Sequence, residues 1–566
     1  MLHQESDEAG RNWAFAQRLV HVLLNAGACH AVLSPGSRNT PVVLALVAAA
    51  DKGHLQLHNV LDERQAGFLA LGLARVSKAP VVLSCTSGTA GSHYWPAIAE
   101  ANQLGLPLIA LTADRPVELQ GRGAPQTMDQ VGLFGRHVRA SASLEPSLEL
   151  LEGERLERRL WTVVSHTLGN AGPVHLNLRF RKPLWAPDLE PANLSWCPTA
   201  VQELPIAESD FAEAFAAVAG AERGVVLAGP REVSADGLAE SAVLAFARQA
   251  GWPVLAEPAS GLQGPEVVFG AEAFLRETDE LATFRPDCIL RIGRSPTAKS
   301  ISQWMASVLE GNTILVEPSG CLLDGERLNP LVVNTTLEWA FSRLQTKTQA
   351  VGWLESWQRA EARTLTCLND ATAEVLWAGS VIPALWDSMG RNDDFHVASS
   401  MAIRDVGSFA RLSGGGPRVS ANRGTNGIDG TIACAVGQAI ASGRQTTVLL
   451  GDLALLHDQA ALGLIGKSLV RVIVFDNGGG GIFQHLPIAE NTAVFEAHFL
   501  TPHSADIPAI ARAHGLKVQT VSALSELKAE LAAFKPGLIH LRVNRAGDFA
   551  RHQAFWQAVH GAQVEQ

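Results

Sequence analysis

Two polar segments each follow an apolar run of the kind that forms a buried parallel strand. Asp452 follows the run 447–450, and Asn477 follows the run 470–475. The Ala/Leu-rich segment 460–466 between them predicts a helix, so we expect both side chains at neighbouring strand ends, where open sheets bind ligands. Carboxylate, amide and carbonyl oxygens suit Mg²⁺, and the nearby glycines would let a diphosphate approach the backbone. The spacing therefore predicts a site for a divalent metal and a diphosphate.

These residues also fit an ordinary loop, because Gly-Asp after a strand and Asn-Gly-Gly are common turn sequences. A second candidate is Glu63, which follows the strand-like run 56–60 and begins the helix pattern that continues over 66–75. A glutamate at this place can act only as a helix cap or as a partner of the helix dipole. Neither segment alone decides between a cofactor site and a loop.

Length and composition predict a large enzyme. A chain of 566 residues with 47% hydrophobic residues is expected to form two to four domains. No stretch of about 18 uncharged apolar residues is present, and residues 1–12 lack the pattern of a secretory signal, so we expect a cytoplasmic protein without a membrane partner. Seven cysteines scattered singly do not suggest zinc, an iron–sulfur cluster or disulfides. A formal net charge of -11 disfavours nucleic acid as a partner.

Strand-like and helix-like runs alternate along the whole chain, which predicts an α/β fold. We expect three blocks, at 1–190, 205–345 and 370–566, with the polar stretch 182–205 as a linker. The expected strands are 31–33, 56–60, 80–84, 107–111, 174–178, 224–227, 254–257, 288–292, 313–316, 395–398, 448–450, 470–475 and 538–543. No Gly-x-Gly-x-x-Gly follows a strand, so a nicotinamide dinucleotide site is not supported.

Several motifs together resemble the 2-succinyl-5-enolpyruvyl-6-hydroxy-3-cyclohexene-1-carboxylate synthases, thiamine-diphosphate enzymes of menaquinone or phylloquinone biosynthesis. The specific motifs are Ser-Pro-Gly-Ser-Arg-Asn-Thr-Pro at 34–41 and Asn-Arg-Gly-Thr-Asn-Gly-Ile-Asp-Gly at 422–430. Asp-Glu-Arg at 62–64 and Thr-Ala-Asp-Arg-Pro at 112–116 add to the resemblance. Thr-Ser-Gly-Thr at 86–89 and the metal motif are shared with acetohydroxyacid synthases and pyruvate decarboxylases. The resemblance implies three doubly wound α/β domains: a pyrimidine-binding domain, a central domain and a diphosphate-binding domain.

The resemblance also implies the activity. The family decarboxylates 2-oxoglutarate with thiamine diphosphate and adds the succinyl carbanion to isochorismate. Its members are homodimers or homotetramers with active sites between subunits. One glutamate, here Glu63, bonds N1′ of the cofactor and promotes loss of the thiazolium C2 proton.

Further residues are carried over by position. The implied ligands of Mg²⁺ or Mn²⁺ are Asp452, Asn477 and the Gly479 carbonyl. The implied cofactor contacts are Glu63, Ser400, Asn426, Ile428 and Asp452, with Ile428 as an apolar wedge beneath the cofactor. The implied substrate contacts are Ser37, Arg38, Arg115, Gln126, Lys299, Ser400, Arg404 and Arg423. The basic members suit two substrates that together carry four carboxylates, since arginine binds carboxylate in bidentate fashion.

Two positions depart from the family pattern. Ser300 stands where a second basic residue is expected after Lys299, so one carboxylate contact could be missing or be supplied from elsewhere. Asp476 replaces an asparagine and adds negative charge beside the expected metal. Two alternatives stay open: another thiamine-diphosphate carboligase or decarboxylase that acts on pyruvate, and a catalytically silent relative that binds the cofactor or a partner.

Overall fold

A computed structural model shows the arrangement of the chain. It describes residues 2–170, 172–187, 189, 194–198, 207–233, 237–276, 283–308, 312–319, 322–346, 350–371, 374–466 and 468–564. The chain forms two compact units. The first contains Met1–Glu203, Gly424–Gly443 and Ala460–Ser468, and the second contains Leu204–Arg423, Arg444–Gln459 and Leu469–Gln566. The first unit therefore includes two segments that lie far along the sequence.

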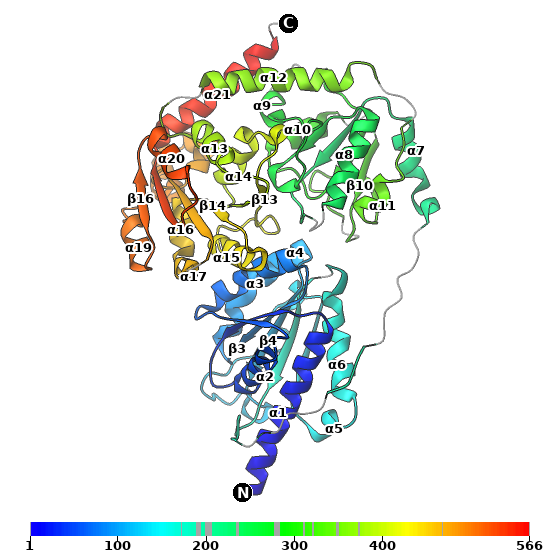
Figure 1. Ribbon diagram of the computed structural model, residues 1–566, viewed down its shortest axis with the longest axis vertical. Coiled ribbons are helices and arrows are strands. Elements are labelled where there is room, and N and C mark those ends of the chain that lie inside the picture. Colours follow the sequence, from blue (N-terminus) through cyan, green and yellow to red (C-terminus); the bar gives the residue numbers. More distant parts are fainter. Residues whose placement is uncertain are drawn as a thin grey trace. The chain divides into compact units, whose positions relative to one another are not determined.

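The first unit is built on a six-stranded parallel sheet in the order β2-β1-β3-β4-β6-β5 (Figure 1). Its strands are β1 (His30–Ser34), β2 (Gln56–Asn59), β3 (Val81–Cys85), β4 (Leu108–Asp114), β5 (Ala140–Leu144) and β6 (Val174–Arg179). Its helices are α1 (Leu2–Asn25), α2 (Thr40–Asp51), α3 (Glu63–Ser77), α4 (Trp95–Leu104), α5 (Leu148–Leu151), α6 (Arg155–Val164), α15 (Thr431–Ser442) and α17 (Leu462–Ile465). Helix α1 contacts α2 and α6, while α3 contacts α4 and α15.

Glycines allow α3 and α15 to approach closely. A Cβ atom on Gly72 of α3 would lie 2.0 Å from the carbonyl oxygen of Cys434, and one on Gly437 of α15 would lie 2.2 Å from that of Leu69. Both distances are far below van der Waals contact, so only glycine fits at these two positions. Helix α15 is thus packed backbone to backbone against α3.

The second unit contains two further parallel sheets, in the orders β11-β10-β9-β7-β8 and β13-β12-β14-β15-β17-β16. The strands of the first of these are β7 (Gly224–Ala228), β8 (Val254–Ala256), β9 (Cys288–Ile292), β10 (Asn312–Val316) and β11 (Leu331–Val333). Those of the second are β12 (Asp394–Val397), β13 (Arg418–Ser420), β14 (Thr446–Gly451), β15 (Val470–Asp476), β16 (Val518–Val521) and β17 (Gly537–Arg542). One hydrophobic cluster includes buried residues from both sheets.

Helices cover these two sheets. They are α7 (Ala212–Gly220), α8 (Leu238–Ala250), α9 (Ala271–Phe274), α10 (Lys299–Ser307), α11 (Leu337–Phe341), α12 (Trp353–Ala371), α13 (Ala378–Asp387), α14 (Met401–Phe409), α16 (Asp452–Asp458), α18 (Thr492–Val494), α19 (Ile507–Ala513), α20 (Leu524–Leu531) and α21 (Arg545–Val564). The long helices α12 and α21 contact each other. Three parallel sheets with flanking helices confirm the predicted α/β fold class.

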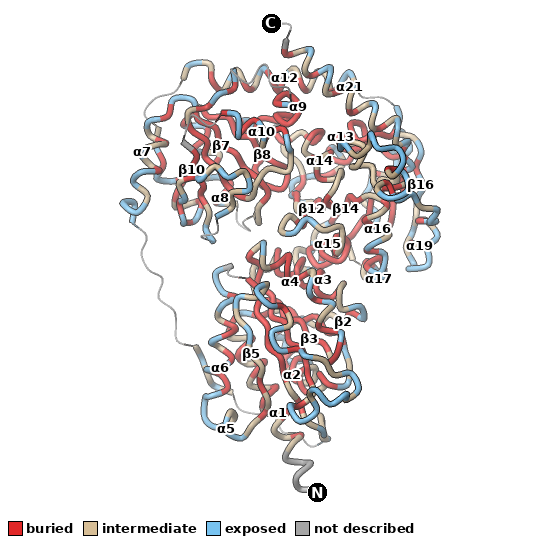
Figure 2. The backbone as a smooth tube through the Cα atoms, turned by 180° about the vertical axis from the view of Figure 1, so that it is seen from behind, coloured by how far each residue is buried: buried red, intermediate tan, exposed pale blue. Residues whose placement is uncertain are grey.

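All the expected strands are present, and the described part of the chain contains four strands that the sequence did not predict: β5, β11, β13 and β16, each at an edge of its sheet. The central strands are buried (Figure 2), whereas each of these four has at least one exposed residue. The three expected block boundaries stay predictions. The expected linker at 182–205 lies partly outside the described residues, at 188, 190–193 and 199–205.

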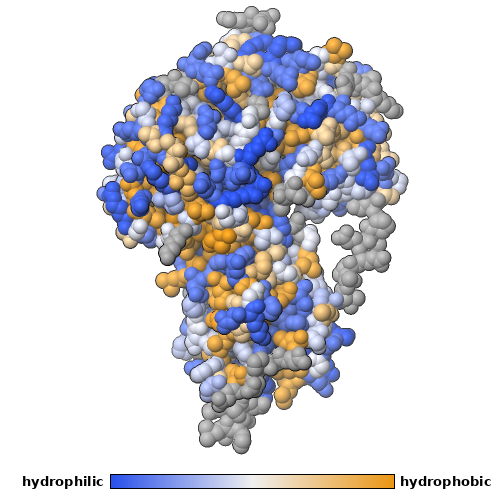
Figure 3. Space-filling model, in the orientation of Figure 1, coloured by the Kyte–Doolittle hydropathy of each residue, from blue (hydrophilic) through white to orange (hydrophobic). Residues whose placement is uncertain are grey.

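Among the described residues, no helix is both long enough and apolar enough to cross a membrane. The face of the second unit seen in Figure 3 carries mainly hydrophilic side chains, with hydrophobic ones scattered among them. Single exposed hydrophobic residues are normal on a globular protein and need no special explanation.

Candidate active site

The strongest cluster of possible metal ligands lies at the ends of β14 and β15. These strands pair in parallel, with Gly451 opposite Phe475, so Asp452 and Asp476 emerge at the same edge of the sheet. One ligand atom each from Asp452, Asp476 and His503 lies within 4.8 Å of the others. Asp452 is 2% exposed, and its Oδ2 accepts a hydrogen bond of 2.7 Å from the Gly479 N–H and one of 3.1 Å from His503 Nε2.

The charges of this cluster suit a cation. Burial raises the pKa of Asp452, and the neighbouring carboxylate of Asp476 adds to this effect. Asp476 is also partly buried, but hydrogen bonds from His540 Nε2 at 2.6 Å and from its other neighbours lower its pKa to about 2. Two acids side by side, at least one of them held in its charged form, attract a divalent cation.

The side-chain oxygen of Asn477 is a further possible metal ligand. Its Oδ1 is buried and has no hydrogen-bond partner among the described residues, which is costly unless a ligand binds there. Gly479 has a φ of 143°, and a Cβ atom there would lie 2.4 Å from the carbonyl oxygen of Leu500. The backbone at 479 therefore takes a shape that requires glycine. The donor set, with carboxylate and amide oxygens, fits Mg²⁺ or Mn²⁺.

Glu63 is the first residue of α3 and is half-buried. The helix is capped by the preceding residue, since the Asp62 side chain accepts hydrogen bonds from the N–H groups of Arg64 and Gln65. Asp62 rather than Glu63 makes these capping bonds. The charge of Glu63 lies close enough to the buried Tyr94 to help raise the pKa of that phenol, although burial is the main cause.

The segment that holds Asn426 and Ile428 belongs to the first unit and precedes α15. Asn426 has a φ of 62°, in the left-handed region that few side chains adopt. Ile428 is half-buried rather than part of the core. In the second unit, Ser400 also has a positive φ, of 69°, at the end of β12. Such strained residues often mark ligand sites.

Two arginines of the first unit lie close enough for the charge of one to act on the other. Arg38 is 5% exposed; its Nη1 donates to the Phe180 carbonyl at 2.6 Å, while its buried Nε has no hydrogen-bond partner. Burial, followed by the charge of Arg115, lowers the pKa of Arg38 to about 10. Arg115 itself is half-buried and donates to the carbonyl of Pro125. Two neighbouring guanidinium groups with an unused N–H bind carboxylate well.

The remaining candidates of the first unit lie on loops. Ser37 is exposed, and its carbonyl accepts hydrogen bonds from Thr40. Gln126 is exposed, has a φ of 56°, and donates from Nε2 to the carbonyl of Ser87 at 2.9 Å. The loop of Gln126 thus lies against the Thr-Ser-Gly-Thr segment.

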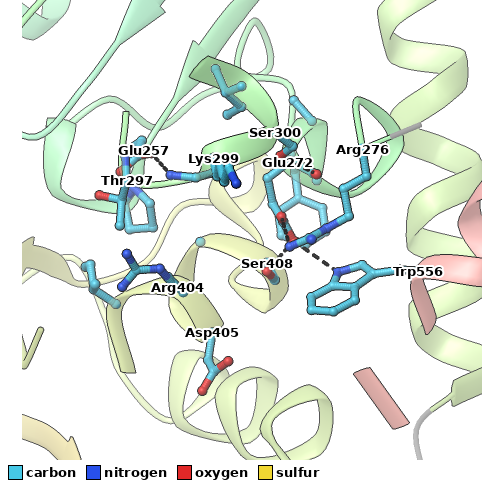
Figure 4. A pocket seen from close by; sticks show the side chains of 18 of the residues that line it. Glu257, Glu272, Arg276, Thr297, Lys299, Ser300, Arg404, Asp405, Ser408 and Trp556 are labelled. Carbon is cyan, nitrogen blue, oxygen red and sulfur yellow. Dashed lines mark hydrogen bonds and ion pairs between the residues drawn. The ribbon is translucent and has the colours of Figure 1, made fainter. Parts of the chain in front are cut away.

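A cavity of about 500 Å³ lies in the second unit, and both Lys299 and Arg404 line it. Figure 4 shows these two cations near Glu257 at one side of the cavity. Lys299 begins α10, and Arg404 lies in α14, where its Nη1 donates to the Ser400 carbonyl at 2.7 Å. Burial lowers the pKa of Arg404, whereas the charge of Glu257 opposes this. The structure therefore brings together two predicted substrate residues from separate segments.

Ser300 does not supply the positive charge that a basic residue at this position would bring to the cavity. Its Oγ is used in a 2.7 Å hydrogen bond to the carbonyl of Glu272, and the residue is 6% exposed. Another cation is present instead, because Arg276 lines the same cavity, pairs with Glu272 at 2.7 Å and stacks 3.6 Å above the Trp556 ring (Figure 4). An arginine at position 300 would have to displace a buried hydroxyl.

Several residues of the site carried no motif. Glu257 is 7% exposed; burial raises its pKa, and the charge of Arg423 lowers it, so this acid lies among the cations of the second unit. It follows an apolar run as Asp452 does, and this signal could have identified it. No pattern marked His503, which bonds Asp452, or Arg276, which stacks on Trp556; both partners are distant in the sequence.

The candidates divide between the two units. The first unit holds Ser37, Arg38, Glu63, Arg115, Gln126, Asn426 and Ile428, and the second holds Lys299, Ser400, Arg404, Arg423, Asp452, Asn477 and Gly479. Arg423 precedes the boundary, and its Nη1 lies 3.5 Å from Ser399 Oγ.

The chain is similar to known proteins along nearly its whole length. Residues 14–133 match the thiamine pyrophosphate enzyme N-terminal TPP binding domain, and residues 405–541 match the C-terminal TPP binding domain. A 2-succinyl-5-enolpyruvyl-6-hydroxy-3-cyclohexene-1-carboxylate synthase of Myxococcus xanthus is 37% identical, with 97% of each chain covered. Proteins of the same name from Chloroflexus aurantiacus and Lysinibacillus sphaericus are 35% and 31% identical, over 98% and 96% of this chain and 97% of each relative. The chain therefore belongs to the 2-succinyl-5-enolpyruvyl-6-hydroxy-3-cyclohexene-1-carboxylate synthase family of thiamine pyrophosphate enzymes.

Proposed function

We propose that this chain is a transferase that decarboxylates 2-oxoglutarate and adds the remaining succinyl group to isochorismate, as a step of menaquinone or phylloquinone biosynthesis. The observation that carries the proposal is the buried Arg38, whose Nε lacks a hydrogen-bond partner and whose pKa is lowered by burial and by Arg115. A bound carboxylate would relieve both penalties. Each unit supplies such cations, as substrates with several carboxylates require.

The cations of the second unit support the same substrate class. Lys299 and Arg404 line one cavity, and Arg423 acts on the same buried acid, Glu257. Burial lowers the pKa of the half-buried Arg404, so a substrate that lacks a carboxylate to pair with it should bind less well. Pyruvate lacks the distal carboxylate of 2-oxoglutarate. We therefore expect 2-oxoglutarate as the donor.

Thiamine diphosphate and Mg²⁺ or Mn²⁺ fit the donor groups. When bound, the cofactor supplies a thiazolium that stabilises negative charge on the carbon freed by decarboxylation. Asp452, Asn477 and the Gly479 carbonyl would hold the metal, and the unpaired Asn477 Oδ1 is the feature that favours this assignment. Ser400, Asn426 and Ile428 would contact the cofactor. The positive φ angles of Ser400 and Asn426 and the half-buried side chain of Ile428 agree with that role.

Glu63 would hold a proton at N1′ of the cofactor. Since Asp62 makes the capping bonds of α3, the Glu63 carboxyl group is available for this task. In the family the glutamate of one subunit faces the metal site of another, so we propose a homodimer or homotetramer with active sites between subunits. Light scattering of the purified protein tests this, because a monomer that is fully active would contradict it.

The decisive experiment is a carboligation assay that pairs isochorismate with 2-oxoglutarate, pyruvate or other 2-oxo acids. We expect product only from 2-oxoglutarate at an appreciable rate. Replacing Arg404 by glutamine should weaken the apparent substrate affinity by roughly 2 to 5 kcal/mol, as for a buried charge pair. Arg158→Gln is the matched control, because this arginine is 76% exposed on α6. Turnover of pyruvate, with no product from 2-oxoglutarate and isochorismate, would refute the proposal.

A further inference from the structure

A buried acid of the first unit binds the segment that precedes α15. Glu100 lies in α4 and is 1% exposed. Its Oε1 accepts a 2.7 Å hydrogen bond from the Gly424 N–H, and its Oε2 accepts bonds of 2.6 and 2.7 Å from the N–H and Oγ1 of Thr425. These residues are 324 and 325 positions apart from Glu100 in the sequence.

The contact between Glu100 and this segment combines short hydrogen bonds to a carboxylate with a close approach of the backbone. A buried carboxylate is costly unless donors surround it, and three donors at short distances meet that need. A Cβ atom on Gly424 would lie 2.9 Å from both the Glu100 carboxyl carbon and its backbone carbonyl oxygen, so glycine is needed for the close approach. The other face of α4 near Glu100 is apolar, with Ala97, Ile98 and Ala101 buried. The observed hydrogen bonds of the Glu100 carboxylate all go to this segment.

The same segment is fixed at its other end. A Cβ atom on Gly430, which precedes α15 and has a φ of 68°, would overlap the Phe68 ring of α3. Between these two fixed points lie Asn426, which is exposed, and Ile428, which is half-buried. The chain between 424 and 430 is thus held at both ends while its middle stays available to a ligand.

We propose that Glu100 is a positioning residue for the thiamine diphosphate site: its carboxylate fixes the start of the segment so that Asn426 and Ile428 are preformed for the cofactor. This inference rests on the proposed function, because it assumes that these two side chains contact the cofactor. Glu100 acts through its hydrogen bonds to Gly424 and Thr425. Its loss should therefore change cofactor affinity and not the chemistry of the loaded enzyme, since preorganisation mainly reduces the ordering cost of binding.

Glu100→Gln is the main variant. The amide nitrogen would face the donors of Thr425 and could not accept from them. The dissociation constant of thiamine diphosphate, measured by tryptophan fluorescence at fixed Mg²⁺, should rise on the order of 10- to 100-fold. At saturating cofactor, kcat and the KM of the 2-oxo acid should return to near the wild-type values.

Two further variants separate positioning from general damage. Thr425→Val removes only the hydroxyl bond at an exposed residue and should raise the same dissociation constant several-fold. Glu157→Gln is the matched control, because Glu157 is a buried acid of the same unit that pairs with Arg18 instead. It should lower the melting temperature of the cofactor-free protein without changing cofactor affinity.

The outcomes are distinct. Unchanged cofactor affinity in folded Glu100→Gln overturns the inference, as does an equal loss in Glu157→Gln. If Glu100→Gln does not fold, Thr425→Val decides: a raised dissociation constant supports the inference and an unchanged one overturns it. A wild-type protein that does not bind thiamine diphosphate at all would instead remove the proposed function, and this inference with it.

Discussion

Replacing Asp476 by asparagine should weaken metal binding. Asp476 lies beside Asp452, with ligand atoms of the two residues within 4.8 Å, and its pKa of about 2 keeps it charged. Asparagine has nearly the same shape, but its single amide oxygen can replace only one of the two carboxylate oxygens, of which Oδ1 accepts from the Gly478 N–H and Oδ2 accepts from His540 Nε2. The substitution therefore removes one negative charge and changes one of these two hydrogen bonds.

The size of the effect follows from Coulomb's law. Removing a unit charge about 5 Å from a divalent cation costs roughly 1.7 kcal/mol at a water-like dielectric constant, and more where the site is drier. This corresponds to binding that is about 15- to 20-fold weaker. Asp452 is only 2% exposed, so the dielectric constant near it is lower than that of water and the effect should be larger than this value.

Titration with Mn²⁺, followed by the electron paramagnetic resonance signal of the free ion, measures this directly. It should be done with thiamine diphosphate present and at the same pH for both proteins. Glu355→Gln makes the same change in net charge at an exposed residue of α12 and should have no effect. Equal Mn²⁺ affinity in Asp476→Asn and the wild type would show that Asp476 does not act on the metal.

Three other predictions follow from the structure. Glu63→Gln should bind thiamine diphosphate but lose about 10² to 10⁴-fold in rate, and unchanged C2 hydrogen exchange of the cofactor would remove Glu63 from the mechanism. Chelation should abolish activity, Mg²⁺ or Mn²⁺ should restore it, and Asp452→Ala should weaken cofactor binding even at high metal; normal binding in that variant would contradict the metal site. Burial lowers the pKa of His175 to about 4, so this residue is neutral in the fold and gains a proton only on unfolding in that range. The contribution of neutral His175 to the free energy of unfolding is therefore complete above pH 6.5, and it is lost by about 1.4 kcal/mol per pH unit as the pH falls toward 4. Denaturant unfolding at several pH values measures this. If the free energy of unfolding of His175→Gln changes with pH as steeply as that of the wild type, the prediction is wrong.

Most of the fold could be predicted because central parallel strands are buried on both faces and therefore read as continuous apolar runs. Strands such as β14 and β15 are of this kind. The edge strand β16 is not: it reads Val-Gln-Thr-Val at 518–521, and its two central residues are polar and exposed. Without an apolar run or a strict alternation, nothing in such a segment distinguishes a strand from a loop.

The candidate site divides in the same way. The neighbouring positions of Asp452 and Asp476 follow from strand order, which the apolar runs already indicated. The partners of the site residues do not, because they depend on which loops meet in space. Glu100 and Thr425 are an example: an acid inside an apolar helix gives no sign that its donors lie more than 300 positions away. A second example is Arg276: the sequence did not indicate that it lines the same cavity as Ser300.

The close crossing of α3 and α15 has a consequence for dividing the chain into fragments. A fragment that ends after the first sheet, near residue 190, would lack α15. The surface of α3 around Gly72 would then lose its contact with the α15 backbone. The complementary fragment would carry α15 with an unmatched Gly437. We therefore expect neither piece to behave as an independent folding unit, whereas co-expression of the two should recover a complex. The sequence order of the blocks is thus a poor guide to where this protein can be cut, duplicated or fused.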